Sequence, residues 1–584
     1  MSRKASSRKT PGTTALLAIA LAVLLAAGVP SAPARAWTTP PPPTLVDVNP
    51  SGNAGDWLIG ATPPNYDPSK PVIVFVQGLH GSAQNWWGPT VYHGTNDMYA
   101  YAYNYGYRTA FVQFRDADGN AGSMWLNGSV LRGQLEAICQ YFGVPKVNIV
   151  GHSKGGVDSN SAVVHYGAYP YVQNIITLGT PHRGSQLADL CYSWWSWWLA
   201  ELLGQRDDGT YVMQTSYMEY FRSITDGRPE DAAIRYYTGA GTDWGPLFSA
   251  MWFGGSYLSL WDASDGVVCR YSAHGHPAAT KIFTGSSFDH DDIRMGSRVW
   301  SLIEPYLRSY RTTTTGTATV TTSSVWDGTQ AGDAKATGQP VPQVVVRGGP
   351  VDGSAETSFS VEPGAAGLEV LCLVGRPETR GSLVAPDGSC IALQSGTADP
   401  AGAGEVFDRA LALGASLTGP APGRWTLRLE GPAADAYLAR IAIGGSVSVG
   451  PVGGLQAVYA PGEEVRFTLD IDTGSARLAG LKADGVVLFT APGRAETKSP
   501  GGAGGKGLGP EINLAARVTF GAAADGTWQG SFRLPGKEGV YNVTLNLTGH
   551  LGDGSVFDRT VVFSVLALRP ENRNAAGLRA LGER

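Results

Sequence analysis

The sequence predicts a mainly parallel β-sheet with helices on both faces, followed by two all-β sandwich-like domains. Between about residues 57 and 310, short apolar runs alternate with helical stretches, as expected for parallel strands joined by helices. Beyond residue 311 the pattern changes to short alternating runs separated by Gly, Pro and Asp, which is typical of antiparallel sandwiches. With 584 residues, 43% of them hydrophobic, the chain has enough material for several packed domains.

The first 36 residues have the composition of an export signal. A basic start is followed by an apolar stretch, Ala15 to Ala27, and then by Ala34-Arg35-Ala36, after which we expect cleavage. A retained membrane anchor is the alternative, but about 13 apolar residues fall short of the roughly 20 that cross a bilayer. We therefore expect a secreted, extracellular protein with no integral membrane segment in its mature chain.

The α/β domain is predicted over residues 57–310, after a Pro-rich lead-in over residues 37–56. A helix is expected from Met124 to Phe142, where apolar residues recur at helical spacing. The expected strands are Val72 to Val76, Thr109 to Phe114, Val147 to Val150, Ile175 to Leu178, Ile234 to Tyr237 and Lys281 to Phe283.

The second half of the chain is divided by composition. Residues 311–340 are rich in Thr and Gly and read as a linker. We expect a β-sandwich domain over residues 341–449, an Ig-like β-sandwich over residues 450–568 and a loose tail over residues 569–584.

The charge balance argues against a nucleic-acid partner. The formal net charge is -5 and only 16% of the residues are charged. Nucleic-acid binding requires a basic field that attracts phosphates, and this composition supplies none.

Ser153 lies in Gly151-His152-Ser153-Lys154-Gly155, directly after an apolar strand and directly before a helical stretch. A sharp turn between a buried strand and a helix lifts the serine clear of the sheet, and the flanking glycines let the backbone pack closely. This placement predicts a nucleophilic serine. A serine hydroxyl also needs a base, an acid that orients the base, and donors for the oxyanion.

The acid and the base are expected later in the chain, in the order nucleophile, acid, histidine. Asp265 is the best candidate acid, with Asp262 as its main competitor. His290 is the best candidate base because it follows a late strand and precedes a terminal helix. The rival histidines, His152, His182, His274 and His276, lack that context.

The oxyanion donors are expected from two backbone amides. The strand ending at Val76 leads into Gln77-Gly78-Leu79-His80-Gly81, where the Leu79 N–H is the first candidate. The Lys154 N–H, directly after the nucleophile, is the second. We expect a structural role for His80 in this loop.

Four motifs in order resemble the secreted bacterial triacylglycerol lipases of the α/β-hydrolase superfamily over roughly residues 57–310. The motifs are Val-Gln-Gly-Leu-His-Gly at 76–81, Gly-His-Ser-Lys-Gly-Gly at 151–156, Leu-Gly-Thr-Pro-His-Arg-Gly-Ser at 178–185 and Ser-Asp-Gly-Val-Val at 264–268. The resemblance implies an α/β-hydrolase fold, a triad of Ser153, Asp265 and His290, and a carboxylic ester as substrate, often a lipid. One departure is Gln77, where many relatives have histidine.

The resemblance also raises the question of a metal, since some such lipases bind structural calcium near the catalytic histidine. Asp289, Asp291 and Asp292 are the candidate ligands here. Acids on a solvated loop are the alternative interpretation, and we expect no cofactor and no catalytic metal.

An unusually apolar insertion, Trp194 to Leu203, lies between the third motif and Asp265. It resembles a lid that shields an acyl pocket and opens at a lipid surface. On this interpretation the substrate-binding residues are Trp194, Trp195, Trp197 and Trp198. The alternative is a buried cap helix that packs on the fold.

Five cysteines allow at most two internal disulfides in an exported chain. The candidate pairs are Cys372 with Cys390, and Cys191 with Cys269. Cys139, on an apolar helix face, is expected to stay free.

These observations predict a secreted serine esterase or lipase that acts through an acyl-enzyme intermediate. The first alternative is an extracellular polyester depolymerase whose β-domains hold an insoluble substrate. The second is a catalytically inactive protein whose β-domains bind a surface.

Overall fold

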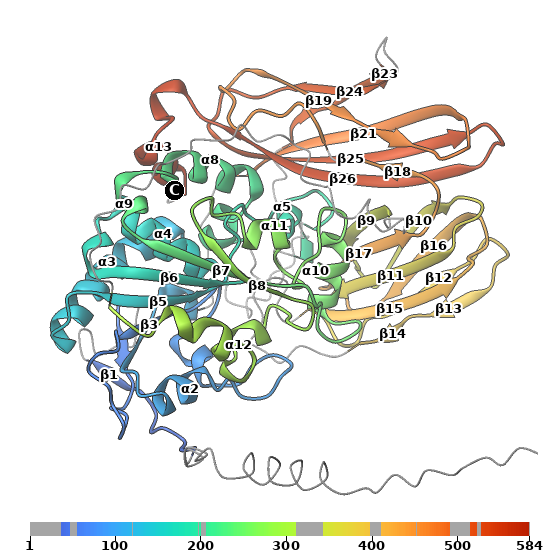
Figure 1. Ribbon diagram of the computed structural model, residues 1–584. Coiled ribbons are helices and arrows are strands. Elements are labelled where there is room, and N and C mark those ends of the chain that lie inside the picture. Colours follow the sequence, from blue (N-terminus) through green and yellow to red (C-terminus); the bar gives the residue numbers. More distant parts are fainter. Residues whose placement is uncertain are drawn as a thin grey trace, which may run out of the picture. The chain divides into compact units, whose positions relative to one another are not determined.

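A computed structural model describes residues 37–46, 55–118, 121–196, 198–199, 206–310, 343–396, 410–450, 452–490, 514–522 and 527–582. The expected signal peptide and linker lie outside the described residues, as does Trp197. The described residues from Pro40 onward form one compact unit, shown in Figure 1.

The first half is built on an eight-stranded sheet with the strand order β1-β2-β4-β3-β5-β6-β7-β8. All neighbouring strands from β4 to β8 run parallel, whereas β1 and β2 are antiparallel additions at one edge. The strands are β1 (Thr44–Val46), β2 (Trp57–Ile59), β3 (Ile73–Val76), β4 (Thr109–Val112), β5 (Val147–His152), β6 (Val172–Leu178), β7 (Arg235–Gly241) and β8 (Thr280–Gly285). Each of the six predicted strands is therefore present.

Helices cover both faces of this sheet because alternate strand residues point to opposite sides. Val74 of β3 packs with Leu135 of α3 in one core, whereas Phe75 packs with Trp300 of α12 in the other. The helices are α2 (Met98–Asn104), α3 (Met124–Phe142), α4 (Lys154–His165), α5 (Gln186–Cys191), α7 (Asp208–Val212), α8 (Thr215–Thr225), α9 (Pro229–Ala232), α10 (Ala250–Leu258), α11 (Arg270–Ala273) and α12 (Gly296–Ile303). Short 3-10 helices are η1 (Ala83–Trp86), η2 (Arg115–Asp118), η3 (Tyr169–Tyr171), η4 (Asp292–Arg294) and η5 (Glu304–Tyr306).

Helix α3 has the predicted bounds, and both of its ends are chemically marked. The Ser123 side chain accepts a hydrogen bond from the Leu126 N–H, which caps the first turn. Gly143 ends the helix with φ of 63°, a left-handed conformation that favours glycine. The residues at helical spacing, including Leu131 and Leu135, are fully buried against the sheet.

The first group of later strands forms two antiparallel sheets around one core. One sheet has the order β14-β15-β11-β17-β9 and the other β10-β16-β12-β13. Val370 of β11 and Leu427 of β16 lie in the shared core. The strands are β9 (Gln343–Pro350), β10 (Ser354–Val361), β11 (Gly367–Val374), β12 (Arg380–Val384), β13 (Cys390–Ala392), β14 (Gln394–Ser395), β15 (Leu411–Thr418), β16 (Gly423–Glu430) and β17 (Ala436–Ile443).

The second group is also antiparallel. Its sheets have the orders β22-β21-β25-β26, β19-β24-β23 and β18-β20, and Phe467 and Tyr541 lie in its core. The strands are β18 (Ser448–Val449), β19 (Glu464–Leu469), β20 (Ile471–Asp472), β21 (Leu478–Thr490), β22 (Leu514–Arg517), β23 (Thr519–Ala522), β24 (Trp528–Arg533), β25 (Gly539–Leu551) and β26 (Val556–Ala567). The predicted fold class is confirmed; the domain limit at residue 450 stays a prediction.

The tail after residue 568 is not loose, contrary to the prediction. It forms η7 (Pro570–Asn572) and the helix α13 (Ala575–Gly582). Leu578 and Leu581 of α13 are buried, and the Tyr217 hydroxyl of α8 donates a hydrogen bond to the Leu578 carbonyl at 2.7 Å. The tail is therefore fixed against the α/β half of the chain.

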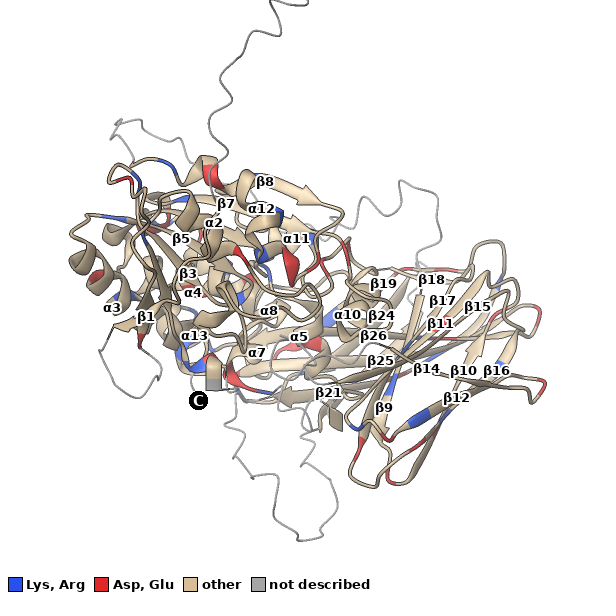
Figure 2. Cartoon of the chain, turned by 90° about the horizontal axis from the view of Figure 1, so that it is seen from below, with Lys and Arg blue, Asp and Glu red and all other residues tan. Residues whose placement is uncertain are grey.

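A single apolar cluster joins the two halves. It contains Tyr211 and Phe253 from the α/β half together with Val346, Leu438 and Leu566 from the later strands. Charged residues of both signs are interspersed along the elements of both halves (Figure 2). Among the described residues, no helix combines the length and the apolar character needed to span a membrane.

Candidate active site

Ser153 occupies a strained turn between β5 and α4. Its φ is 50° and its ψ is -132°, a positive φ that residues with a side chain rarely adopt. A Cβ at Gly155 would lie 2.3 Å from the Gln77 carbonyl oxygen, and one at Gly151 would lie 3.0 Å from the Gly156 nitrogen. A side chain is excluded at Gly155 and would be tightly crowded at Gly151, which accounts for the two glycines of the motif around the serine.

His290 and Asp265 form a buried pair. The His290 Nδ1 lies 2.7 Å from the Asp265 Oδ2, and the two side chains are 2% and 0% exposed. The other carboxylate oxygen, Oδ1, accepts hydrogen bonds from the Val267 and Val268 amides at 3.0 and 2.7 Å. The amides hold the carboxylate in place, and a proton on Nδ1 leaves Nε2 of the ring available as a base.

Asp262, the competing acid, does not contact this histidine. Its carboxylate is bound by the Arg270 side chain at 2.8 Å and by the Tyr271 amide at 2.8 Å. The rival histidines also have other partners: His182 bonds with Thr177, His274 with Thr238 and His276 with Asp231.

The turn that carries Ser153 meets the His290–Asp265 pair at one edge of the sheet. His152, next to the serine, bonds through Nε2 to the His290 carbonyl at 2.8 Å, and the two rings lie 4.7 Å apart. On the neighbouring strand, a Cβ at Gly179 would lie 2.8 Å from the Asp265 Oδ2 and 3.1 Å from the His290 Nδ1. The structure therefore places the turn that carries Ser153 beside the His290–Asp265 pair.

The candidate oxyanion loop follows β3. Leu79 is only 4% exposed, and His80 has φ of 54°, which places a second non-glycine residue in the left-handed region. The His80 Nε2 lies 2.5 Å from the Asp207 Oδ2. His80 therefore bonds within the fold, as its predicted structural role requires.

Gln77, the departure from the family pattern, faces the neighbouring strand. In the amide orientation that satisfies both polar atoms, Gln77 donates to the Val112 carbonyl at 2.7 Å and accepts from the Phe114 amide at 2.8 Å. The side chain is 1% exposed. The Gln77 side chain therefore links the candidate oxyanion loop to the end of β4.

The Lys154 side chain forms a buried charge cluster that was not predicted from the sequence. Its ammonium is fully buried and lies 3.0 Å from the Asp158 carboxylate and 3.3 Å from the Asp116 carboxylate. Asn127 donates to both carboxylates at 2.9 Å. Burial raises the pKa of Asp158 to about 7, against the opposing effect of Lys154. The signal in the sequence is a lysine at a buried turn, which must find counter-charges.

The acids around His290 are buried, so the interpretation of them as solvated loop acids is wrong. Asp289, Asp291 and Asp292 are 2–3% exposed. His93, Asp289 and Asp292 place three potential ligand atoms within 4.8 Å of one another. However, Asp291 pairs with Arg294 at 2.6 Å, and Asp292 pairs with Arg298 at 2.8 Å. Because cationic side chains neutralise this loop, the residues fit a divalent ion poorly.

The aromatic insertion contacts the later strands. The Trp195 Nε1 donates to the Asn546 Oδ1 of β25 at 3.0 Å, and the Arg347 guanidinium of β9 lies 5.4 Å from the Trp195 ring centre. Trp194 and Trp198 meet edge to face at 6.2 Å. This packing corresponds to the cap alternative, and the assignment of these residues to substrate binding stays a prediction.

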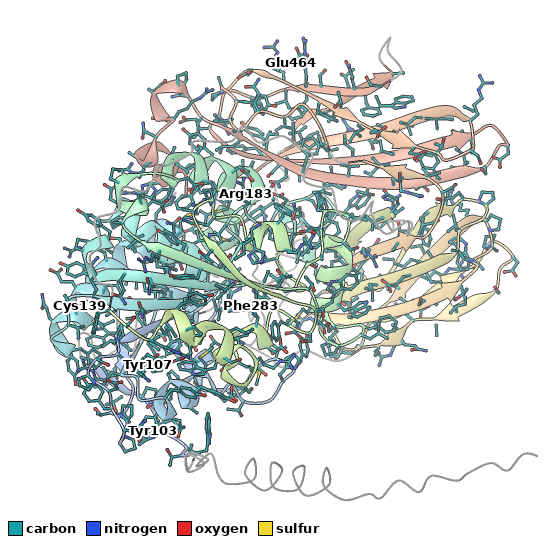
Figure 3. The ribbon with its side chains drawn as sticks, viewed as in Figure 1. Tyr103, Tyr107, Cys139, Arg183, Phe283 and Glu464 are labelled. Atoms are coloured by element: carbon teal, nitrogen blue, oxygen red, sulfur yellow. The ribbon has the colours of Figure 1, made fainter. Side chains whose placement is uncertain are left out.

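Neither expected disulfide is present among the cysteines. Cys372 is buried in the β11 core, whereas Cys390 is exposed on β13, which belongs to the opposite sheet. Cys191 and Cys269 are both buried as free thiols, and the Cys269 Sγ donates to the Gln186 side chain at 3.6 Å. Cys139 on α3 is free, as predicted (Figure 3).

The third motif is tied to the helical part of the fold. The Arg183 guanidinium, labelled in Figure 3, lies 2.8 Å from the Glu219 carboxylate of α8. The Ser185 hydroxyl donates to the Val267 carbonyl at 2.7 Å, two residues after Asp265. This motif therefore supports the loop that carries the acid.

Known proteins similar to this chain include several lipases. The family described as "PGAP1-like alpha/beta domain" matches residues 67–192. Triacylglycerol lipase 2 of Saccharomyces cerevisiae is 23% identical over 304 residues, which span 45% of this chain and 92% of that protein. The Bacillus licheniformis lipase BlEst2 in its propeptide form is 29% identical, with a TM-score of 0.66, and the match covers 89% of this chain and 98% of that one.

The mature form of the same Bacillus licheniformis lipase is 43% identical, with a TM-score of 0.40, and the match covers 44% of this chain and 99% of that one. The fold, the arrangement of the site and these similarities agree with one another. The chain belongs to the lipases and esterases of the α/β-hydrolase superfamily and is a carboxylic ester hydrolase.

Proposed function

We propose that the protein is a secreted serine ester hydrolase that acts through an acyl-enzyme intermediate, with Ser153, His290 and Asp265 as its triad. The observation that carries this proposal is the 2.7 Å bond between the His290 Nδ1 and the Asp265 Oδ2 beside the strained serine turn. A carboxylate in this position fixes the tautomer of the ring and stabilises the imidazolium that forms during the reaction.

In the proposed mechanism the Ser153 oxygen attacks the ester carbonyl carbon while the His290 Nε2 accepts the hydroxyl proton. The Leu79 and Lys154 amides donate hydrogen bonds to the oxyanion of the tetrahedral intermediate. Collapse of the intermediate breaks the bond to the alcohol, which leaves with the proton from His290. Water then attacks the acyl-enzyme, again with His290 as base, and releases the acid and the free serine.

The test of the nucleophile is Ser153→Ala, combined with labelling by a fluorophosphonate. We expect the variant to fold and to lose both turnover of a chromogenic acyl ester and the label. The matched control is Ser161→Ala on the same helix, which removes a buried hydroxyl away from the reacting atoms. Full ester turnover by Ser153→Ala would refute the assignment.

We propose that the substrate class is a lipid ester in water. The support is the apolar insertion, of which Leu199 belongs to the large apolar cluster and Trp195 and Trp198 pack against it, together with the triacylglycerol lipase to which the chain is similar. Parallel assays on triglyceride emulsions and polyester films would separate this proposal from the polyester alternative. A failure of the fluorophosphonate to label any serine would favour the inactive binding protein.

We infer that the later β-strands cover the cap in the manner of a propeptide. Two observations support this inference. A single apolar cluster joins the halves, and the similar Bacillus licheniformis lipase has a propeptide form and a mature form. Turnover of emulsified triglyceride should rise after a specific protease cuts an engineered recognition sequence between residues 311 and 342. Unchanged turnover after complete cutting and separation of the halves would refute a covering role.

We also propose that export precedes activity. The basic start and apolar stretch before Ala36 support this proposal. N-terminal sequencing of protein from the culture medium should begin at Trp37, and recovery of only the uncleaved chain inside cells would contradict it.

A further inference from the structure

Asp207 is the point at which three separate segments meet. Its Oδ2 lies 2.5 Å from the His80 Nε2 and accepts the Ala121 amide at 3.0 Å. Its Oδ1 accepts the Thr210 amide at 2.8 Å and thereby caps α7. One carboxylate therefore joins the loop after β3, the segment before α3 and the start of α7.

The capping bond alone does not explain this arrangement. A cap needs one acceptor, and Oδ1 supplies it, whereas Oδ2 faces His80 and Ala121. Asp207 is 3% exposed, so a carboxylate at this position requires compensation. Burial would raise its pKa, but the His80 ring and the two amides together lower the pKa below its ordinary value.

His80 is the residue directly after Leu79, and its conformation is costly. A non-glycine residue with φ of 54° is strained and persists only where its surroundings hold it. The short bond to Asp207 is such a restraint. Because Leu79 and His80 are consecutive, holding the His80 ring restrains the backbone torsions that direct the Leu79 N–H.

The helix α7 also contacts Leu79 directly. A Cβ at Gly209 would lie 2.8 Å from the Leu79 Cδ1 and 2.5 Å from the Ala121 Cβ. The Gly209 amide donates to the Ala121 carbonyl at 2.9 Å. Helix α7 thus contacts the Leu79 side chain, and Asp207 binds the next residue, His80.

We propose that Asp207 is a positioning residue for ester hydrolysis, acting through His80 to hold the Leu79 N–H toward the oxyanion. This proposal rests on the proposed function, in which Leu79 is an oxyanion donor. Asp207 itself contacts no reacting atom. Its effect should be confined to the charged tetrahedral state, because the Leu79 N–H interacts most strongly with the oxyanion.

The test compares Asp207→Asn with Asp231→Asn as a matched control. Asp231 also pairs with a buried imidazole, that of His276 at 3.2 Å, but it belongs to α9. The asparagine at position 207 keeps an acceptor for the Thr210 amide and loses the charge that binds His80. Losing a whole oxyanion donor lowers kcat by about 10²–10³-fold, which sets the upper limit.

We expect Asp207→Asn to lower kcat for a soluble ester by about 10- to 100-fold, with KM changed less than threefold. A boronic acid, which forms a tetrahedral adduct with the serine, should bind weaker by a similar factor. Asp231→Asn should change stability without lowering kcat at a nearly constant KM. His80→Gln retains an amide donor, so it should lose less activity than His80→Ala.

Wild-type kcat in folded Asp207→Asn would overturn the proposal. An equal fall of kcat in Asp231→Asn at the same loss of Tm would also overturn it, because the effect would then be one of stability. These outcomes are separate from failure of the proposed function. In that case the wild-type serine takes no fluorophosphonate label, and Ser153→Ala retains turnover.

Discussion

Asp158→Asn should make the protein more stable at pH 8, even though it removes one partner of a buried ion pair. The wild-type cluster holds one ammonium, Lys154, between two carboxylates, Asp158 and Asp116. Above neutral pH this leaves one unbalanced negative charge in the interior. The substitution keeps the shape of the side chain and leaves Lys154 paired one to one with Asp116.

The size and sign of the effect follow from the pKa of Asp158. Its pKa is raised from 3.8 to about 7 by burial, so the folded protein binds a proton that the unfolded chain has already released. Proton binding to the folded state stabilises it below pH 4, and this stabilisation is lost as the pH rises from 4 to 7. A shift of about 3 units corresponds to at most about 4 kcal/mol.

Thermal unfolding of the wild type and Asp158→Asn at pH 5 and pH 8 measures this effect. At pH 5 the folded wild type still holds the proton and most of this stabilisation remains, so the two Tm values should agree within about 2 °C. At pH 8 the variant should have the higher Tm, by several degrees. The measured quantity is the Tm of Asp158→Asn minus the Tm of the wild type. A smaller difference at pH 8 than at pH 5 would refute the reasoning.

Three further substitutions test other contacts, and two of them have a matched control variant. Asp265→Asn should lower kcat by about 10⁴-fold, because the amide no longer holds the required tautomer of His290; steady-state kinetics with kcat within tenfold of wild type would contradict this. Gly155→Ala should abolish soluble expression, since its Cβ would lie 2.3 Å from the Gln77 carbonyl oxygen. Gly133→Ala on α3 meets nothing within 4 Å and should be tolerated, as thermal unfolding would show. Gly348→Val should loosen the covering strands, because its Cβ would lie 1.9 Å from the Trp195 carbonyl oxygen, and binding of an apolar dye should increase. Gly349→Val, whose nearest contact is 3.7 Å away, is the control, and equal dye binding by both variants would exclude the clash as the cause.

The sequence predicted the elements whose signals are local. Helix α3 has the predicted bounds because its apolar spacing, its Ser123 cap and its terminal Gly143 all lie within one stretch of chain. The tail was misjudged for the opposite reason. Leu578 and Leu581 of α13 bury their side chains against helices more than 350 residues earlier, and no local pattern records that partner.

The candidate site shows the same division. Ser153, Asp265 and His290 could be predicted from their order and short motifs, and the structure places His290 against Asp265; their catalytic roles stay a prediction. The disulfides were mispredicted because sequence spacing does not show that Cys372 and Cys390 lie in opposite sheets. Contacts between distant side chains, such as that of His80 with Asp207, had no signal beyond the presence of the residues.

Two consecutive amides connect the supports of both candidate oxyanion donors. The Ala121 N–H donates to Asp207, which holds His80 beside Leu79. The Gly122 N–H donates at 3.2 Å to Asp116, which pairs with the Lys154 side chain. A buried ammonium or carboxylate costs several kcal/mol unless it is paired in good geometry, so neither support tolerates a displaced partner. Because residues 121 and 122 are adjacent in the chain, we expect a shift of this segment to disturb the supports beside Leu79 and Lys154 together.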